Sequence, residues 1–498
     1  MMRFSPIPNR AHLIHWREWG EEPFRDAQEQ NKPVMLFLSA FWCRYCQRMD
    51  EGAFSDPENI ALLNAYFIAV RAENAERPDV DARYNLNGWP TIIFMAPGGK
   101  LLAAVNYFES EPFGNLLARV YALHEQSKNE SRREPIAEAP RETPAPKRAD
   151  LSPASVLQVS ERIMELADPL YGGYGRGQKF IHPEASDFLL ARYEATKDPA
   201  YLNHVRLTLD TMRRRPIRDP DRGGYYRTCS RADWSRPHRE KLLADQAGLV
   251  RNCLGAFRIT GRPEYAEMAS EIIDYMDTSL SDPKTGAFYG CEDFIRREGA
   301  EASGAANDLA IVDDCIYTDA NAQAIVAYLE AAVILETPAR KRRALAALDF
   351  LWHRCRSPQA GMFHYFDGAP HLPGLLNDQA RMGTALVEAY RSTGEEKYLR
   401  RAQELAEFIL RRLKSPHGGY YDLVPEESSG PMSPLISVEQ NGAAASFLLA
   451  LAEPLPEARY RDAAARALGA FPGDVSGYGI DAAEFAQALG EFLSRERP

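Results

Sequence analysis

The stretch VMLFLSAFWCRYC, residues 34–46, decides how the first part of the chain folds. Its first six residues are a continuous apolar run of strand length, which predicts a strand buried on both faces. Two cysteines, Cys43 and Cys46, follow at once, at the point where the chain turns from this strand into a helix. The stretch therefore predicts an α/β domain whose central strand ends at a pair of thiols.

The position of Cys43 at the start of a helix indicates redox chemistry. Unpaired backbone N–H groups and the positive end of the helix dipole lower the pKa of a thiol there. We expect Cys43 to be the attacking thiolate, with Arg44 adding positive charge beside it, and Cys46 to resolve the mixed disulfide. The alternatives are a structural pair or a zinc site completed by His12 and His15.

The surrounding residues extend this domain to about residue 125. Further strands are predicted at 67–71, 91–95 and 100–106, the last two joined as a hairpin by a Pro-Gly-Gly turn. Helices are predicted at 23–30, 46–53, 57–64 and 111–125. Residues 126–150 are charged and carry four prolines, which indicates an extended linker.

From residue 151 to residue 498 the pattern is helical. Twelve helices are predicted, at 152–167, 184–196, 199–213, 241–259, 263–279, 317–335, 338–355, 373–392, 396–413, 437–451, 457–469 and 480–495. A degenerate turn with Asp or Ser, then Pro and Gly, followed by an aromatic residue, occurs five times, first at 168–174. Such helical hairpins form either an open solenoid or a closed ring, and the uneven lengths between them favour an (α/α)6 toroid.

Residues 34–101 resemble thioredoxin. The buried strand, the Trp42-Cys43 start of the motif and the later Trp89-Pro90-Thr91 are the features that carry the resemblance. It implies that Pro90 is cis and faces the cysteines, with Trp42 and Trp89 supporting them. Two features depart from the pattern: Phe37 stands where thioredoxin has a buried acid, and Arg-Tyr replaces Gly-Pro between the cysteines.

Nearly the whole chain resembles the YyaL-type thioredoxin-domain proteins, which include spermatogenesis-associated protein 20. The matching motifs lie at 16–24, 76–81, 88–90, 172–175 and 238–247. This resemblance implies a multidomain chain, an α/β thioredoxin fold followed by an all-α toroid of the six-hairpin glycosidase-like type. Members commonly have His where this chain has Arg44 and Gln47.

A toroid gathers residues from successive hairpins at the end where its inner helices begin. Candidate cavity residues there are Tyr174, Arg176, Trp234, His238, Asp245, Tyr317, Asp319, Asp378 and Glu439. Paired carboxylates with aromatic surfaces are typical of sugar chemistry. The alternative is that the acids are helix N-caps and that the aromatic residues belong to the core.

Composition bounds the remaining possibilities. A formal net charge of −11 on 498 residues, without a basic cluster, argues against nucleic-acid or membrane binding. Seven cysteines, five of them isolated, indicate a cytoplasmic protein rather than a secreted disulfide framework. We expect no cofactor and no bound metal.

Three functions fit the sequence. The first is a thiol–disulfide oxidoreductase that acts on a protein dithiol or disulfide and uses the toroid to recognise its substrate or partner. The second is a carbohydrate-active enzyme, an N-acylglucosamine 2-epimerase or a six-hairpin glycosidase, with an accessory thioredoxin domain. The third is a non-catalytic scaffold. The first is favoured because its chemistry lies on contiguous residues.

Overall fold

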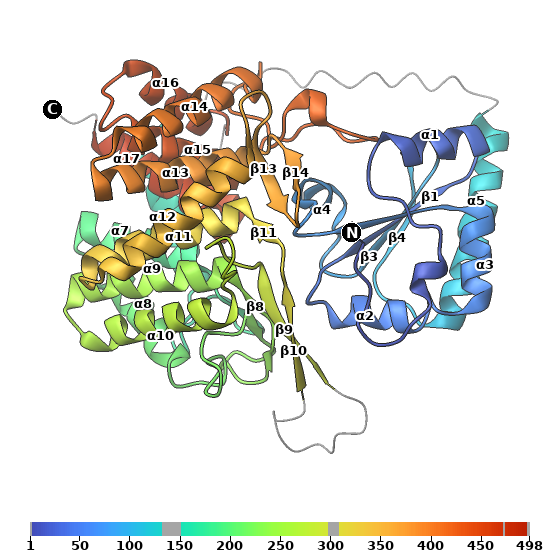
Figure 1. Cartoon of the computed structure of the whole chain (residues 1–498), viewed down its shortest axis with the longest axis horizontal. Helices are drawn as coiled ribbons and strands as arrows, with labels where there is room; N and C mark the ends of the chain where they lie inside the picture. The colour runs from blue at the N-terminus through green and yellow to red at the C-terminus, as the bar shows by residue number, and fades with distance from the viewer. Residues whose placement is uncertain (1, 132–150, 297–307, 472–473, 496–498) are drawn as a thin grey trace. The chain divides into compact units, whose positions relative to one another are not determined.

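The computed structural model describes residues 2–131, 151–296, 308–471 and 474–495 (Figure 1). The chain forms two compact units: Met1–Pro144 with Glu426–Pro434, and Ala145–Pro425 with Leu435–Pro498. The first is α/β and the second mainly helical, which confirms the predicted fold class. Most of the predicted linker, residues 132–150, lies outside the described residues. The closing helix of the α/β unit runs to Ser131, beyond its predicted end.

A four-stranded sheet forms the centre of the first unit. Its strands are β1 (Val34–Ser39), β2 (Ile68–Glu73), β3 (Thr91–Met95) and β4 (Leu101–Val105), in the order β2-β1-β3-β4. β1 pairs with β2 in parallel, whereas β1–β3 and β3–β4 are antiparallel. Every residue of β1 is buried, because helices cover both faces of the sheet.

The side chains of β1 alternate between two cores. Met35 and Phe37 join the core that contains Cys43, Cys46 and residues of α2 (Arg44–Glu51), α3 (Pro57–Tyr66) and α5 (Ser110–Ser131). Val34, Leu36 and Leu38 join the opposite core with residues of α1 (Glu21–Gln30) and α4 (Pro78–Tyr84). The continuous apolar run of the sequence is thus explained by a strand between two helical layers.

The second unit is a closed ring of helical hairpins. The inner helices α7, α9, α11, α13, α15 and α17 each contact the next, and α17 contacts α7. An outer helix packs against each of them, and the first helix of the unit, α6, pairs with the last, α17. The bounds are α6 Pro153–Leu166, α7 Pro183–Thr196, α8 Pro199–Met212, α9 Leu243–Thr260, α10 Pro263–Ser279, α11 Thr318–Ile334, α12 Pro338–Arg354, α13 Leu376–Thr393, α14 Glu396–Arg412, α15 Val438–Leu451, α16 Ala458–Leu468 and α17 Ala483–Ser494. This closure confirms the toroid.

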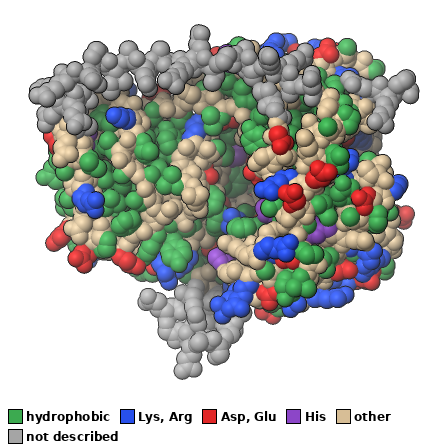
Figure 2. Space-filling view, turned by 180° about the vertical axis from the view of Figure 1, so that it is seen from behind, with side chains coloured by type: hydrophobic (Ala, Val, Ile, Leu, Met, Phe, Trp, Pro, Cys, Tyr) green, Lys and Arg blue, Asp and Glu red, His purple; other side chains and the backbone are tan. Residues whose placement is uncertain are grey.

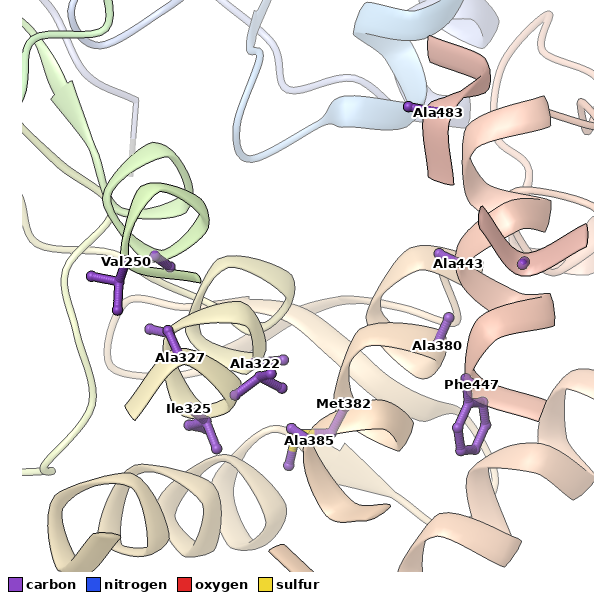
Figure 3. Close-up of a cluster of buried hydrophobic side chains, with 14 of the residues drawn as sticks. Val250, Ala322, Ile325, Ala327, Ala380, Met382, Ala385, Ala443, Phe447 and Ala483 are labelled. Atoms are coloured by element: carbon purple, nitrogen blue, oxygen red, sulfur yellow. The ribbon is translucent and has the colours of Figure 1, made fainter. Parts of the chain in front are cut away.

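Small side chains allow the inner helices to approach one another closely. Ala322, Ala380, Ala443 and Ala483 are fully or almost fully buried near the beginnings of four of these helices (Figure 3). Gly442 of α15 faces the backbone of α17, where a Cβ atom would lie 2.7 Å from the Phe485 nitrogen. Larger residues at such positions would push the helices apart.

The recurring turns use one local hydrogen-bond pattern. Asp168, Asp219 and Asp282 each accept backbone N–H bonds from residues two or three positions later, and Ser357 and Ser415 do the same in the last two turns. In the first two turns a buried lysine also binds the acid, with distances of 2.8 Å from Lys179 to Asp168 and 2.7 Å from Lys241 to Asp219. The degenerate repeat is therefore a repeated turn closed by hydrogen bonds from its own backbone to an Asp or Ser side chain.

Short strands interrupt the helical pattern, although the sequence gives almost no strand signal after residue 151. Two hairpins stand out: β9 (Cys291–Arg296) with β10 (Asp308–Asp313), and β13 (Gly361–Phe366) with β14 (Pro370–Pro373). The others are two-residue strands: β5 Lys179–Phe180, β6 Thr228–Cys229, β7 Pro237–His238, β8 Lys241–Leu242, β11 Ile316–Tyr317 and β12 Arg356–Ser357. These strands lie in the connections that precede inner helices.

Candidate functional site

Cys43 and Cys46 form a disulfide at the start of α2. Cys43 is the N-cap residue, and its sulfur accepts the Cys46 backbone N–H at 3.1 Å. Cys43 is 6% exposed and Cys46 is 2% exposed, so both are buried and Cys43 is slightly the more accessible. The Cys46 N–H thus donates to the sulfur that we expect to attack.

The loop before β3 lies next to this disulfide. The Trp89–Pro90 peptide bond is cis, as predicted. The Trp89 ring packs edge-on against the Trp42 ring with centroids 5.1 Å apart, and Trp42 directly precedes Cys43. The indole N–H of Trp89 donates to Asp81 Oδ1 of α4 at 2.9 Å, which fixes the orientation of the ring.

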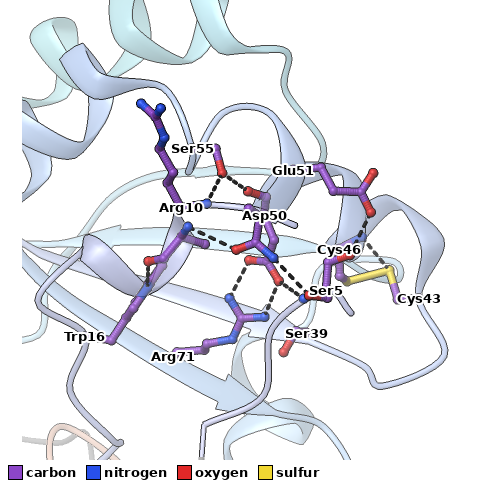
Figure 4. A network of polar contacts seen from close by, with 12 residues as sticks. Ser5, Arg10, Trp16, Ser39, Cys43, Cys46, Asp50, Glu51, Ser55 and Arg71 are labelled. Carbon is purple, nitrogen blue, oxygen red and sulfur yellow. Dashed lines mark hydrogen bonds and ion pairs between the residues drawn. A yellow bond between two sulfur atoms is a disulfide. The ribbon is translucent and has the colours of Figure 1, made fainter. Parts of the chain in front are cut away.

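A buried ion pair between Asp50 and Arg71, which the sequence does not reveal, lies near Cys46 (Figure 4). Asp50, one turn after Cys46 on α2, accepts two hydrogen bonds from Arg71 of β2, at 2.7 and 2.9 Å. Asp50 also accepts the Ser5 backbone N–H at 2.9 Å. The Arg71 guanidinium lies 4.9 Å from the centre of the Phe37 ring, the position where thioredoxin carries an acid. Both oxygens of Asp50 are occupied, so this pair braces α2 against the sheet.

Arg44 does not direct its charge at Cys43. Its guanidinium donates along α2 to Glu51, at 2.7 and 3.1 Å, and to Gln47 at 3.1 Å. The expected contribution of Arg44 to the thiolate is therefore offset by Glu51. The helix N-terminus remains as the feature that favours a Cys43 thiolate.

The toroid acids lie within the first turns of inner helices but are not N-caps. Asp245, Asp319 and Asp378 occupy the second or third helical position, whereas the N-cap residues are Leu242, Tyr317 and Leu375. The N-cap interpretation is therefore wrong for these three acids. Instead, an amide side chain one or two residues after each acid bonds the preceding turn and holds the start of the helix in place.

Each of four inner helices carries a fully buried amide that clamps the preceding turn. Its oxygen accepts the backbone N–H of the turn's aromatic or Met residue, and its NH2 group donates to the carbonyl of the same residue. The pairs are Gln246 with Tyr225, Asn321 with Phe288, Gln379 with Met362 and Asn441 with Tyr420. An acid stands one or two residues before each amide, so the clamp positions the acid at the mouth of the ring.

Three acids in the first turns of inner helices, Asp245, Glu439 and Glu184, have raised pKa values. Burial raises the pKa of Asp245 to about 7, with smaller upward contributions from the charges of Glu184 and Glu240 and an opposing one from Arg227. The side chain of Glu439 is exposed, but the protein atoms packed around it and the charge of Glu184 raise its pKa to about 7, against the lowering effect of Arg381. Burial likewise raises the pKa of Glu184. Asp245 Oδ2 is a buried oxygen without a hydrogen-bond partner.

Arg381 of α13 balances part of this negative charge. It donates to both carboxylate oxygens of Glu484 of α17 at 2.7 Å, and it lies close enough to Glu184 and Glu439 to favour their ionised forms. A cavity of about 290 Å³ is lined by all six inner helices, with Glu184, Arg381 and Glu484 in its wall, but the nine cavity residues predicted from the sequence do not line it. Glu184, Arg381 and Glu484 carry no signal in the sequence, because each is an ordinary helical residue until the ring closes.

A second cluster joins the beginnings of α11 and α13. Asp319, His364 and Asp378 bring ligand-type atoms within 4.8 Å of one another. His364 Nδ1 lies 3.0 Å from both oxygens of Asp378, and burial raises the pKa of Asp378 to about 6. Asp319 accepts hydrogen bonds from the Ala320 backbone and the Asn377 side chain. These N–H donors already engage the carboxylates, which fits a hydrogen-bonded cluster better than a metal centre.

The predicted aromatic walls of the cavity are part of the core. Trp234 is completely buried, donates to the Tyr171 carbonyl and packs on Gly173. Tyr174 is 4% exposed, and Tyr317 is also buried, with its hydroxyl donating to Asp313 at 2.9 Å. The prediction that Trp234 and Tyr174 offer stacking faces to a sugar is therefore wrong. The remaining two candidates, Arg176 and His238, are exposed.

The surface of the helical unit mixes acidic, basic and His side chains, as its visible face shows (Figure 2). Ion pairs link neighbouring outer helices, for example Arg213 with Glu267 and Arg401 with Asp349. Within the described part of the chain, no helix is long and apolar enough to cross a membrane.

Fold and site together define a class: a thioredoxin-fold unit with a CxxC disulfide, followed by a six-hairpin toroid. Residues 8–140 match the family described as "Thioredox_DsbH: Protein of unknown function, DUF255". Human spermatogenesis-associated protein 20 is 30% identical over 305 residues, covering 56% of this chain and 39% of the human protein. The resemblance to that family is thus confirmed, although the chain spans less than half the length of this relative.

Each unit also has relatives of its own. The thiol:disulfide interchange protein DsbD of Yersinia pestis is 39% identical over 84 residues, covering 16% of this chain and 14% of DsbD. Cellobiose 2-epimerase of Bacillus thermoamylovorans has a TM-score of 0.54 at 14% identity, covering 69% of this chain and 98% of the epimerase. At that identity the epimerase shows the toroid fold alone.

Proposed function

We propose that the first unit is a thiol–disulfide oxidoreductase acting on a protein substrate, with the toroid as its substrate or partner module. The observation that carries the proposal is the Cys43–Cys46 disulfide at the N-terminus of α2, beside the Trp89–Pro90 loop. The similarity to a thiol:disulfide interchange protein supports it.

The proposed exchange proceeds in two steps. In the reduced enzyme the Cys43 thiolate attacks one sulfur of a substrate disulfide, which forms a mixed disulfide and releases the other substrate sulfur as a thiolate. The Cys46 thiolate then attacks the Cys43 sulfur, which releases the second substrate thiolate and leaves the Cys43–Cys46 disulfide. A dithiol donor restores the reduced pair by the reverse exchange.

Insulin reduction by dithiothreitol tests this function. The full chain should accelerate the reaction, and Cys43→Ser should abolish the acceleration. Cys355→Ala is the matched control, because Cys355 is a buried free thiol of the helical unit. Acceleration that survives Cys43→Ser would overturn the proposal.

We also propose a cytoplasmic setting. Cys229, Cys253, Cys291, Cys315 and Cys355 are all free and buried, which suits a reducing compartment. Fractionation of cells that produce the protein would test this, and recovery in an oxidising compartment would contradict it.

A second candidate function is carbohydrate chemistry in the toroid. It is favoured by the unpartnered Asp245 Oδ2 beside Glu184, and by the raised pKa of Glu439, because sugar-processing sites combine a protonated acid with a second carboxylate. Calorimetry with amino sugars and oligosaccharides should detect binding that Asp245→Asn weakens. Absence of binding across the panel would leave the toroid as a protein-recognition module.

A further inference from the structure

A segment from between two toroid helices belongs to the α/β unit. Residues Glu426–Pro434, called the strap here, pack with the first unit rather than with the helices that flank them in sequence. The Trp19 indole N–H donates to the Ser429 carbonyl at 3.2 Å, and the Gly430 backbone N–H donates to Glu21 at 2.7 Å. Met432 is 8% exposed and joins the core of Trp19 and Phe24.

The strap fits its surface closely. A Cβ atom on Gly430, whose φ is +67°, would lie 2.7 Å from the Phe24 ring. A Cβ atom on Gly99 would lie 2.3 Å from Pro431. Arg83 of α4 donates two hydrogen bonds to the Ser433 carbonyl, at 3.0 and 2.7 Å. Main-chain hydrogen bonds together with one buried apolar side chain are how protein surfaces bind extended peptides.

Contacts connect this surface to the redox pair. Arg83 also binds the Asp79 carbonyl of α4 at 2.7 Å, so the strap and this helix share one guanidinium. Two residues before Arg83, Asp81 accepts the Trp89 indole N–H, and the Trp89 ring packs on Trp42 beside Cys43. A movement of α4 would therefore shift Asp81 and, through its hydrogen bond, the Trp89 ring.

The base of the strap is anchored in the helical unit. Asp422 and Leu435 exchange two hydrogen bonds of 2.8 Å, and the Asp422 carbonyl accepts the backbone N–H of Leu376, the first residue of α13. Shortly after the strap, Ser437 caps α15. The residues that precede and follow the strap are thus held within the helical unit by these hydrogen bonds.

We propose that the surface formed by Trp19, Phe24 and Arg83 is a peptide-binding site for the strap, and that strap docking is coupled to the redox state of Cys43 and Cys46. The coupling rests on the proposed thiol–disulfide function. Because coupling between two sites is reciprocal, reduction of the disulfide changes strap docking, and loosening the strap changes the redox equilibrium.

Hydrogen exchange of the full chain tests the first half. Amide exchange in residues 426–434, including Gly430, is compared between oxidised protein and protein reduced with dithiothreitol, with free thiols counted to verify reduction. The exchange rate should differ by about fivefold or more, the lower range of typical allosteric couplings. In the Cys43→Ser/Cys46→Ser variant, dithiothreitol should change nothing.

Equilibration with glutathione tests the reciprocal half. Arg83→Gln and Met432→Ser should shift the equilibrium constant of the disulfide by a similar factor, whereas Glu427→Gln, an exposed strap residue, should not. A fully reduced wild type with unchanged strap exchange overturns the coupling and leaves the oxidoreductase proposal intact. A pair that dithiothreitol cannot reduce in the folded protein overturns the oxidoreductase proposal itself.

Discussion

Cys43 and Cys46 differ in their surroundings, although they lie only one helical turn apart. Cys43 is the N-cap of α2 and its sulfur accepts the Cys46 backbone N–H, whereas Cys46 lies within the helix and is slightly more buried in the core that both share. We therefore expect Cys43 in the Cys46→Ser variant to be alkylated faster at neutral pH than Cys46 in the Cys43→Ser variant. The expected difference is about tenfold for each unit by which the two pKa values differ. Iodoacetamide rates measured against pH would decide, and a faster Cys46 would reverse the assigned roles.

Asp245 should make the stability of the protein depend on pH. Its pKa is raised from 3.8 to about 7, mainly by burial, so the folded state binds a proton that the unfolded state releases between these values. Stability contributed by this acid is therefore lost as pH rises through that window, by about 1.4 kcal/mol per pH unit. Asp245→Asn should gain stability relative to wild type between pH 5 and pH 7 in urea unfolding. A difference that is constant over this range would contradict the raised pKa.

The disulfide pair and the cis-proline were predictable from sequence, whereas the residues of the toroid were predictable only in part. Cys43, Cys46 and Pro90 are local signals, because strand, motif and loop stand in a fixed order. Asp50 and Arg71 carry no such signal, since their pairing depends on two elements meeting in space. Trp234 was misassigned for the same reason: the sequence cannot tell a turn aromatic that faces a cavity from one that packs on a glycine.

At the scale of single elements, the amide clamps join each turn to its inner helix. Asn321 satisfies both backbone groups of the buried Phe288, so Asn321→Ala leaves an N–H and a carbonyl without partners. We expect a loss of about 2–6 kcal/mol in the free energy of unfolding, given about 1–3 kcal/mol for each of the two unsatisfied buried groups. Gln323→Ala on the same helix is the control, because Gln323 lines the cavity, and it should cost less than about 1 kcal/mol. Equal losses in both variants would contradict the clamp.

Helices were easier to predict than the strands and clamps of the connections. The twelve helical ranges follow from apolar spacing, which is repeated over several turns in each helix. The amide clamps could not be predicted because the clamped residue lies 21, 33, 17 or 21 positions before its amide. This spacing has no constant period. The β9 and β10 strands could not be predicted because they are short and carry charged residues such as Glu292 and Asp293.

At the scale of the whole toroid, closure of the ring depends on close helix contacts. Gly→Ala within a helix ordinarily gains about 1 kcal/mol, but at Gly442 the new methyl group would meet backbone atoms of Phe485 at 2.7 and 2.8 Å. We therefore expect Gly442→Ala to lose about 1–3 kcal/mol in thermal or urea unfolding.

Gly490→Ala on α17 provides the matched control for this prediction. Its methyl group would lie at an ordinary distance of 3.9 Å from Val156, so this variant should be stabilised. Stabilisation by both substitutions would show that α15 and α17 do not approach as closely as described.

The pairing of α6 with α17 has a consequence for how the protein is made. The first helix of the toroid must wait on the ribosome for its partner, the last, so the ring cannot close until translation has passed residue 494. The α/β unit waits too: from Ser131 to Glu426 there are 295 residues (426 − 131), about 15–60 s of synthesis at 5–20 residues per second. During that interval the Trp19 and Phe24 surface is uncovered on the nascent chain. Chaperones that bind apolar segments can bind it there.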